Sequence, residues 1–597
     1  MNSKTYKLFY DNLIVFITAL IPVVFWQPFF DPFGPAQLMV LRVFVPLAFF
    51  FYFLSFIKAP LIEIKINPVV IILLLYILVC CVSLFYSINR QISFKYIYEL
   101  TLSIAGGWLI YSAGGRKGMG KVFAVIIVFH TIIAGYGIMQ HFDADIFKWN
   151  TNFTGRPMGT IGNPDFFAGE LLISIFLTLS YLIFGKKYRV LLAISTIIQM
   201  VCFIYAKVAG TYIGFAAGAA VLVIIALLKF KPSGKKTALW ALALIIAGII
   251  LMPFIYSKSG KFIEEKKHSL RDRMLMWEAS ILMFKDSPVI GKGFGNYRLY
   301  YPKYQGELLN DPKNNKFDYV VTWMPHQNYL LIMAETGIAG IVLFLAAVFA
   351  GFYFLTKSLK SEINPYNASI ASALIALLWA SFFNTFYNVP STMLFFFLFL
   401  IAAAGINGKE RVLILKNPGI KIICIAGLVL FVYSAAGDGT TIVSSVYLKK
   451  ANSLTRQKIL DKAIPMYERI MQLAPVELCP QTDVAQFYYA AEAYREAGML
   501  QKAYELYGKD LKLNPYCPEV NNMYGALAGQ LGNIDLSIAH LKTAVFTAPH
   551  YETAYTNLAT AYMVKGDKES AKAILKQFVE KNGTNERIEI LIKAAGN

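Results

Sequence analysis

The feature that most constrains this chain is a series of long apolar runs, each of the length that a helix needs to cross a bilayer. About 20 apolar residues span the hydrocarbon core of a membrane. Runs of that order lie at roughly 11–31, 38–57, 67–87, 94–113, 121–141, 165–185, 189–207, 210–229, 237–256, 327–355, 366–386, 390–407 and 419–437. Only 15% of the 597 residues are charged, compared with about 25% in soluble domains. The sequence predicts an all-α, polytopic membrane protein with about 12–13 transmembrane helices.

The net charge of +20 indicates topology rather than nucleic-acid binding, because the positive charges alternate between loops. One set of loops contains Lys58 and Lys65; Arg116, Lys117 and Lys121; Lys186, Lys187 and Arg189; Lys229, Lys231, Lys235 and Lys236; Lys357 and Lys360; and Lys409, Arg411 and Lys416. By the positive-inside rule these loops and the N-terminus are cytoplasmic. The loop 142–164, the long loop 257–325 and the tail from 438 are then expected outside.

The tail has a different composition, polar and helical, with a regular period. Gly498, Gly532 and Gly566 are 34 residues apart, and Pro515 and Pro549 repeat the interval. This pattern resembles the tetratricopeptide repeat. We therefore expect two domains, a membrane domain over 1–437 and a solenoid over 438–597 with about four helix pairs. Such solenoids bind proteins or peptides, and a purely structural cap is the alternative.

Two cysteines of the tail, Cys479 and Cys517, could form a disulfide if the tail is extracytoplasmic. Nothing in the sequence shows that they do. The carboxylates of the outer loops lack the close spacing of a cation site, so we expect no metal and no cofactor.

A histidine stands where the long outer loop enters the apolar run at 327–355. Pro325 suits a first helical position, which would put His326 in the first turn. At about 100° per residue, Gly337 and Gly340 share the helix face of His326 and let a neighbouring helix approach it. The positive end of a helix disfavours imidazolium, so we expect a neutral His326 that can act as a base.

Basic residues precede this histidine in the same outer loop. In Ser269–Lys285, Leu270, Met274, Trp277, Ile281 and Phe284 recur at helical spacing. They predict an amphipathic helix on the outer membrane surface with Trp277 as its interfacial anchor. Arg271 and Arg273 lie in its first turns and are candidate ligands for an anionic substrate. The glycine-rich stretch Pro288–Asn296 follows and predicts a tight turn.

These stretches resemble motifs of the bacterial O-antigen ligase family and the related Wzy-type polymerases. His326-Gln327, nine residues and then Gly337-x-x-Gly340 resemble H-[NSQ]-x9-G-x-x-G. Arg271-x-x-x-Leu275 and Arg273-x-x-x-Trp277 resemble R-x3-L and R-x3-W, and Pro288–Gly295 resembles P-x-x-G-x-G-x-G. Arg156 to Asp165 resembles R-x-x-G-T-x-G-N-P-N, with Asp165 in the last position. The arginine that ligases carry near the eighth span is missing here, and Lys207 is the nearest cation, without the bidentate fork of arginine.

The resemblance implies an all-helical fold of the kind found in lipid-phosphosugar glycosyltransferases (GT-C-like), in the bacterial cytoplasmic membrane. It implies transfer of a glycan from undecaprenyl diphosphate to an acceptor on the outer face, without nucleotide sugars. We expect this transfer to be a direct inverting displacement that needs no metal. His326 would be catalytic. Arg271, Arg273, Arg156, Lys207, Gln327 and Asn163 would bind substrate, and Gly337, Gly340 and Trp277 would be structural.

The sequence leaves three acceptors open: lipid A core, a growing polysaccharide in a Wzy-type polymerase, or a protein in an O-oligosaccharyltransferase. Two more distant alternatives are a lipid-linked oligosaccharide flippase and a membrane-anchored scaffold. A flippase would be expected to show internal duplication of its helices, which we do not find. A scaffold would not need arginines and a histidine gathered on one side of the membrane.

Overall fold

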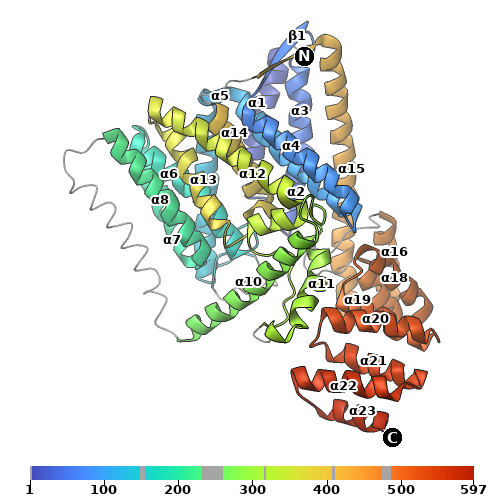
Figure 1. Cartoon of the computed structure of the whole chain (residues 1–597). Helices are drawn as coiled ribbons and strands as arrows, with labels where there is room; N and C mark the ends of the chain where they lie inside the picture. Colours follow the sequence, from blue (N-terminus) through green and yellow to red (C-terminus); the bar gives the residue numbers. More distant parts are fainter. Residues whose placement is uncertain are drawn as a thin grey trace.

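The computed structural model describes residues 3–147, 149, 155–230, 260–314, 317–405, 411–473 and 486–596. The predicted span at 237–256 and Cys479 lie outside the described residues. The described chain is largely helical, as the sequence predicts, with a membrane bundle and a C-terminal solenoid joined by one long helix, α15 (Figure 1).

The bundle is built from apolar helices of the length that a bilayer requires. Its elements are α1 (Ser3–Leu20), α2 (Gly34–Met39), the π-helix η1 (Val40–Phe44), α3 (Val45–Leu54), α4 (Pro68–Ser83), η2 (Leu84–Tyr86), α5 (Arg90–His141), α6 (Pro164–Phe184), α7 (Arg189–Ala206), α8 (Ala209–Phe230), α12 (Asn328–Ser361), α13 (Pro365–Ala380), η4 (Phe386–Asn388), α14 (Pro390–Gly405) and α15 (Asn417–Arg456). Between α8 and α12 lie α10 (Gly260–Asp286), α11 (Tyr297–Leu309) and η3 (Pro312–Asn314).

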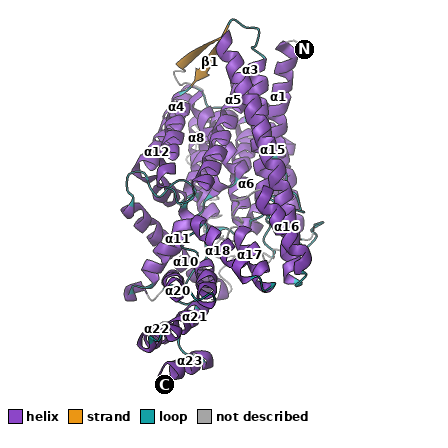
Figure 2. Cartoon of the chain, turned by 90° about the vertical axis from the view of Figure 1, so that its right-hand side faces the viewer, coloured by secondary structure: helices purple, strands orange, loops and turns teal. Residues whose placement is uncertain are grey.

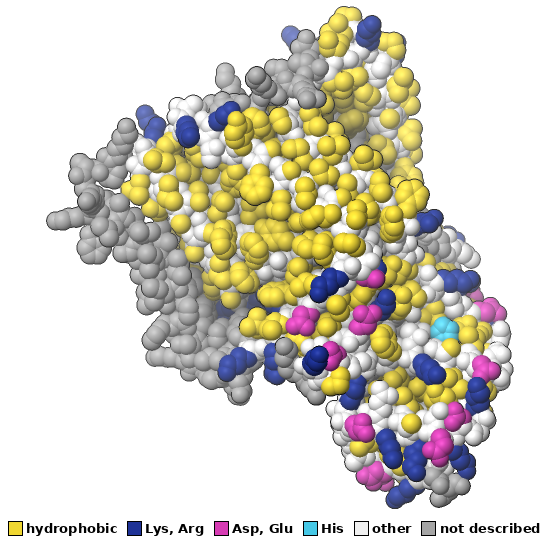
Figure 3. Space-filling view, viewed as in Figure 1, with side chains coloured by type: hydrophobic (Ala, Val, Ile, Leu, Met, Phe, Trp, Pro, Cys, Tyr) yellow, Lys and Arg dark blue, Asp and Glu magenta, His cyan; other side chains and the backbone are white. Residues whose placement is uncertain are grey.

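Among the described residues, eight helical segments are long and apolar enough to cross a membrane, and α13 and α14 are shorter apolar helices. The visible face of the bundle is a broad hydrophobic surface, and charged side chains gather beyond its edges and on the solenoid (Figure 3). Within the bundle, α6, α13 and α14 are buried along almost their whole length. This protein is therefore a multi-pass membrane protein.

Two spans predicted at 94–113 and 121–141 belong to one helical element, α5, of 52 residues. The backbone N–H of Asn89, just before α5, donates to Asn296 Oδ1 (3.1 Å), and His141 at its end hydrogen-bonds Gly155 O (2.6 Å). Both partners belong to loops predicted to be outside. Leu109 O, near the middle, accepts from Tyr10 in the N-terminal helix (2.5 Å). The two ends of α5 therefore lie on one side of the bundle and its middle on the other, so the element crosses the bundle twice.

A small two-stranded ribbon lies near the N-terminus. Strands β1 (Leu61–Ile66) and β2 (Arg411–Lys416) are antiparallel, with Leu61 opposite Lys416 and Ile66 opposite Arg411. They belong to two loops that the charge pattern assigns to the same side. The N-terminus and this ribbon lie at one end of the molecule and the solenoid at the other (Figures 1 and 2).

In its described residues, the solenoid consists of four helix pairs and a final helix. The last turns of α15 pack on α16 (Leu460–Leu473). Then follow α17 (Gln486–Glu496) with α18 (Leu500–Leu513), α19 (Pro518–Gln530) with α20 (Ile534–Thr547), α21 (Glu552–Lys565) with α22 (Lys568–Asn582), and α23 (Glu586–Gly596). Gly498, Gly532 and Gly566 all have positive φ, and Lys458 has the same conformation between α15 and α16. The first repeat thus uses the end of a membrane helix, and α15 runs without a break through the predicted domain boundary at 437/438.

The solenoid packs against α11. Asn310 Nδ2, just after α11, donates to Phe546 O (2.9 Å), and Lys581 Nζ donates to Asn310 Oδ1 (2.7 Å). A Cβ on Gly306 would lie 2.4 Å from Phe546 O, so this contact requires glycine. In the loop between η3 and α12, the rings of Tyr319 and His550 are 4.2 Å apart. The loop that leads to His326 therefore touches the solenoid directly.

Candidate functional site

His326 lies before α12, not in its first turn as the sequence predicted. The helix begins at Asn328, and its N-cap is Gln327, whose Oε1 accepts the backbone N–H of Leu330 (2.5 Å). The polar Gln327 side chain can satisfy a free N–H of the first turn, whereas Pro325 is buried in the preceding loop. His326 has a φ of +50°, which is uncommon for a residue with a Cβ. The side chain is half-buried.

The predicted helix face shared by His326, Gly337 and Gly340 does not exist, because α12 is broken at Gly337. This residue has φ +63° and ψ −160°. The glycine-rich stretch Pro288–Asn296 fills the break: Ile338 N–H donates to Pro288 O (2.8 Å) and Lys292 N–H donates to Ala334 O (2.9 Å). A Cβ on Gly337 would lie 2.4 Å from Val289 backbone atoms. The glycines of both motifs thus allow the backbone of the loop after α10 to hydrogen-bond directly to the backbone of α12.

Glu335, beside this break, is buried within α12 and completes the connection. Its Oε1 accepts the backbone N–H of Tyr297 at the start of α11 (3.0 Å), and its carbonyl accepts Gly293 N–H (3.0 Å). Gly340 does not contact a neighbouring helix at its Cα, since a Cβ there would meet the side chain of Thr336 from the preceding turn. The break therefore anchors the loop between α10 and α11 to the bundle.

The amphipathic helix is present as α10, and it packs on the rest of the protein through a second face, outside the predicted membrane-facing stripe. Met276, Ala279 and Met283 are buried against α11 and α12, whereas Leu270 and Ile281 are exposed by 51% and 39%. Trp277 Nε1 donates to Pro325 O (3.1 Å). The predicted interfacial anchor therefore holds the peptide that precedes His326.

The two arginines of α10 have different surroundings. Arg273 is half-buried, and its Nη1 donates to Phe383 O (2.8 Å). It forms no ion pair with the described residues. Arg271 is exposed, because residues two apart on a helix point in nearly opposite directions. Of the two, Arg273 is the one that belongs to the site.

The loop before α6 brings a second arginine to the site. Arg156 Nη2 pairs with Asp165 Oδ1 (2.5 Å), and its Nε donates to Ala206 O (2.8 Å). Asn163 is the N-cap of α6, where its Oδ1 accepts Asp165 N–H (2.8 Å). Lys207 follows Ala206 directly and ends α7 in a left-handed conformation with φ +55°. The structure therefore places Lys207 next to the residue that binds Arg156.

The charges of these segments act on His326. Burial is the largest effect on the pKa of His326 and lowers it from 6.5, and the positive charge of Arg273 lowers it further. A hydrogen bond with Asn384 and the charge of Asp165 act in the opposite direction. Burial also lowers the pKa of Arg273, against the charge of Asp165. The balance favours a neutral imidazole, through burial and Arg273 rather than through the first turn of a helix as predicted.

The loop Ser381–Thr385 also belongs to the site, although the sequence predicts a membrane span over 366–386. Helix α13 ends at Ala380. Ser381 O then accepts the N–H of Asn328 (3.0 Å), Phe383 O accepts Arg273, and Asn384 Oδ1 lies 3.3 Å from His326 Nδ1. Adjacent polar residues within an apolar run, Asn384-Thr385, were the signal that could have shown the end of the helix.

An apolar groove lies beside the histidine. It has a volume of about 360 Å³ and is lined by Trp277, Gln327, Leu330, Trp379, Phe382 and Phe383. Trp379 and Phe382 are exposed by 49% and 44%. Two of the residues that line the groove also contact the site. Trp277 binds the peptide that precedes His326, and Phe383 binds Arg273.

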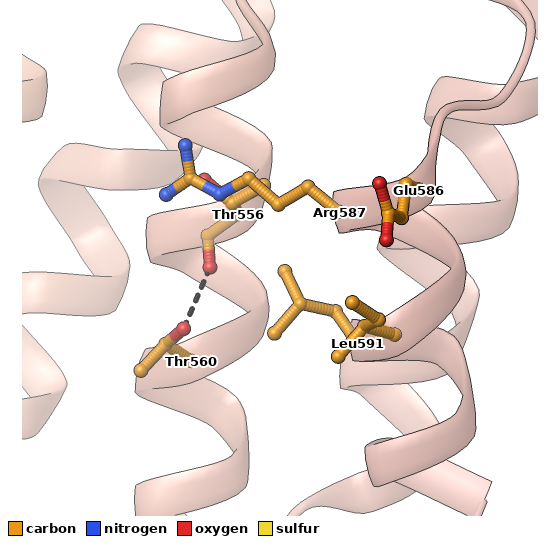
Figure 4. A pocket seen from close by; sticks show the side chains of 6 residues that line it. Thr556, Thr560, Glu586, Arg587 and Leu591 are labelled. Carbon is orange, nitrogen blue, oxygen red and sulfur yellow. Dashed lines mark hydrogen bonds between the residues drawn. The ribbon is translucent and has the colours of Figure 1, made fainter.

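A second cavity, of about 380 Å³, lies in the solenoid between α21 and α23. It is lined by Thr556, Thr560, Glu586, Arg587, Ile590 and Leu591. The Arg587 side chain extends toward Thr556, and Thr560 Oγ1 donates to Thr556 O (2.8 Å) (Figure 4). This cavity offers a cation, Arg587, a carboxylate, Glu586, and an apolar wall.

Comparison with known proteins agrees with both parts of this description. Residues 191–345 match the family described as O-Antigen ligase, and residues 552–582 match the Tetratricopeptide repeat. A "Putative polysaccharide ligase" of Rickettsia bellii (strain RML369-C) is 25% identical over 230 residues, which are 38% of this chain and 51% of that protein. The chain thus spans about half the length of this curated relative.

Solved structures with similarity to part of this chain include those of MamA and YrrB. Residues 41 to the end of MamA from Desulfovibrio magneticus RS-1 are 18% identical, with a TM-score of 0.23, covering 26% of this chain and 89% of that one. YrrB, described as a TPR protein with an unusual peptide-binding site, is 15% identical, with a TM-score of 0.23, covering 28% and 82%.

Proposed function

We propose that this O-antigen-ligase-like membrane protein with tetratricopeptide repeats transfers a glycan from an undecaprenyl diphosphate carrier to an acceptor at the outer face of the bacterial cytoplasmic membrane. The observation that carries the proposal is that His326 and Arg273, far apart in the sequence, lie near each other and within electrostatic reach of the Arg156–Asp165 pair. An apolar groove lined by Gln327 and Phe383 lies beside His326 and Arg273. A base, fixed cations and an apolar surface are the groups that a lipid diphosphate donor requires.

The chemistry is a direct displacement at the anomeric carbon. His326 takes the proton of the acceptor hydroxyl, whose oxygen attacks the anomeric carbon opposite the diphosphate. The bond from that carbon to the diphosphate oxygen breaks, and the carrier diphosphate leaves with the bonding pair. Attack from the opposite side inverts the anomeric configuration.

The leaving diphosphate gains negative charge, which fixed cations stabilise. Arg273 suits this role because no described carboxylate pairs with it, and burying an unpaired charge is costly. An arriving diphosphate would supply the missing partner. Arg156 is already paired with Asp165, so it contributes less free positive charge. Among the described residues, no three His, Cys, Asp or Glu side chains gather as a metal site, and arginines would supply the positive charge of the proposed reaction.

The groove provides a place for the apolar part of the donor. Its lining residues Trp379 and Phe382 have large exposed rings, and burying apolar surface contributes about 25 cal/mol per Å². A polyprenyl chain in this groove would bring its diphosphate to the end that Phe383 shares with Arg273. Gln327, which caps α12 and lines the groove, would lie beside that diphosphate.

The solenoid supplies a separate surface for a protein or peptide partner. Tetratricopeptide repeats bind such partners, and the cavity at Arg587 suits an acidic group with an adjacent apolar side chain. Because α20 packs against α11, a partner bound to the solenoid would be held on the side of the membrane that carries His326.

The test uses the purified full chain in proteoliposomes with an undecaprenyl-diphosphate-linked oligosaccharide. Three acceptors are offered separately: lipid A core, a chain of the same glycan and a protein. Transfer to one of them, seen as a change in gel mobility and mass, supports the proposal and names the acceptor. A folded protein that transfers to none of the three would contradict it. Deletion in the native host, with lipopolysaccharide, capsule and glycoproteins compared, gives the same answer in the cell.

A further inference from the structure

Asn384 is a buried amide, exposed by 1%, in the loop between α13 and η4. Its Oδ1 lies 3.3 Å from His326 Nδ1 and also accepts the backbone N–H of Thr385 (2.9 Å). Its Nδ2 has no hydrogen-bond partner among the described residues. Asn384 therefore uses its oxygen, not its nitrogen, toward the histidine.

The orientation of this amide is determined by its second contact. The two ends of an asparagine amide are easily exchanged in a structure, and hydrogen-bond partners decide between them. A backbone N–H can only donate, so the atom that faces Thr385 N must be the carbonyl oxygen. That same oxygen faces His326. A ring nitrogen that faces an acceptor must carry a hydrogen, so the proton of the neutral imidazole lies on Nδ1.

A neutral histidine has one protonated nitrogen and one lone pair. With the proton on Nδ1, Nε2 keeps the lone pair and can accept a proton. The opposite tautomer would place a lone pair against the Asn384 oxygen, where two acceptors repel each other. The contact thus favours the form of His326 in which Nε2 is basic.

The backbone around Asn384 holds the other parts of the site in place. Phe383 O accepts Arg273 from α10, and Ser381 O accepts the first N–H of α12. Thr385 Oγ1 contacts Met324 Sδ, two residues before His326. The loop Ser381–Thr385 therefore contacts Arg273, the start of α12 and the segment that precedes His326. These contacts restrict any movement of Asn384 relative to the proposed base and cation.

We propose that Asn384 is a positioning residue, which keeps the proton of His326 on Nδ1 and leaves Nε2 free to take the proton of the acceptor. This inference rests on the proposed function for its catalytic consequence, but the tautomer itself can be measured without any reaction. In this role Asn384 acts through His326 and does not touch the substrate.

The charged groups that act on His326 are Arg273 from α10 and Asp165 from α6, the latter paired with Arg156. An aspartate at 384 would add a negative charge directly at Nδ1. It would keep both hydrogen bonds, because its oxygens accept from Thr385 N–H and from Nδ1–H. An opposite charge this close favours imidazolium and raises the pKa of the histidine.

The first experiment measures transfer against pH for Asn384→Asp, Asn384→Leu and the control Asn388→Asp, which changes an exposed amide in the neighbouring η4. Protonated His326 is inactive as a base. We expect N384D to shift the acid limb of the kcat profile about one pH unit upward or more, and N388D to leave it in place. We expect N384L to lower kcat about 10- to 100-fold with KM for the donor unchanged, as for other groups that orient a histidine.

The second experiment does not depend on transfer. The full chain, with ¹⁵N-labelled histidine, is studied by NMR, and the ring signals lost in His326→Ala identify His326 among the six histidines. We expect a proton on Nδ1 in the wild type and a shift toward the other tautomer in N384L.

A proton on Nε2 in the wild type, or an unmoved acid limb in folded N384D, would overturn the role of Asn384. The two proposals can fail separately. Absence of glycan transfer by the wild type with the expected tautomer would contradict the proposed function and leave the contact with Asn384 intact.

Discussion

Two arginines in this protein, Arg42 and Arg273, illustrate the difference between a charge that holds a membrane protein together and a charge that is available to a ligand. Arg42 lies among the membrane helices, where it pairs with Glu99 and, at 3.2 Å, with Asp438. All three side chains are buried. Arg273 lies in α10 outside the spans and has only the carbonyl of Phe383 as a hydrogen-bond partner among the described residues.

The physical reason is the surroundings of each arginine. A charge in hydrocarbon is costly, so intramembrane arginines pair with partners inside the protein. The Arg42 cluster joins η1, α5 and α15, and α15 is also the helix that begins the solenoid. At the outer face, an arginine without a carboxylate partner can be balanced by an anionic substrate. We infer that the Arg42 cluster is structural and that the Arg273 site is functional.

The largest expected effect is that of His326→Ala, which removes the proposed base. General base catalysis contributes about 10²- to 10⁴-fold, so transfer should fall by at least that factor while membrane insertion is retained. Because burial and Arg273 lower the pKa of His326 below 6.5, the acid limb of the wild-type profile should also lie below pH 6.5. Transfer is assayed in proteoliposomes. Wild-type rates in this variant would refute the role of His326.

Arg273→Ala should lower transfer about 10²- to 10³-fold, the scale for loss of one group that stabilises developing charge. Its matched control is Arg271→Ala on the exposed side of the same helix, for which we expect less than a threefold change. The measurement is kcat/KM for the diphosphate-linked donor. Equal effects in the two variants would mean that the anion site lies elsewhere.

Substitution in the Arg42 cluster should affect stability before catalysis. Asp438→Asn or Arg42→Met leaves a buried charge with an incomplete partner, and breaking such a pair costs about 3–5 kcal/mol. Thermal unfolding in detergent measures the loss. Arg42→Met combined with Glu99→Gln and Asp438→Asn removes all three charges and should recover much of it. If the single variants unfold like the wild type but lose transfer, the inferred division between a structural and a functional arginine is wrong.

The smallest expected effect is that of Gly306→Val at the contact between α11 and the solenoid. A Cβ there would lie 2.4 Å from Phe546 O, so the two surfaces must separate. The solenoid remains attached through α15 and should stay folded. We expect faster proteolytic cleavage between the parts and a modest loss of transfer, a few-fold at most. Asn310→Ala, which removes one hydrogen bond without a clash, is the milder comparison.

The sequence predicted which segments lie together better than how they are arranged. His326, Arg273 and Arg156 were recognised by motif, and they do meet. The helix start at Pro325 and the face shared with Gly337 were wrong, because Gln327 caps the helix and Gly337 breaks it. The face by which α10 packs on α11 and α12 was not predicted, since an apolar stripe can face either lipid or protein. The start of α12, its break at Gly337 and the packing face of α10 all depend on contacts with residues that are distant in the sequence.

The sequence by itself determined that this chain is a membrane protein, how its apolar runs are distributed and that a 34-residue repeat ends it, because length, hydrophobicity and period are local properties. Only the tertiary structure decided that Arg42 pairs with carboxylates while Arg273 pairs with none among the described residues, and that Asn384 lies against His326. Those results depend on side chains from separate helices that meet in space. The periodicity of the sequence does not show which side chains of separate helices come into contact.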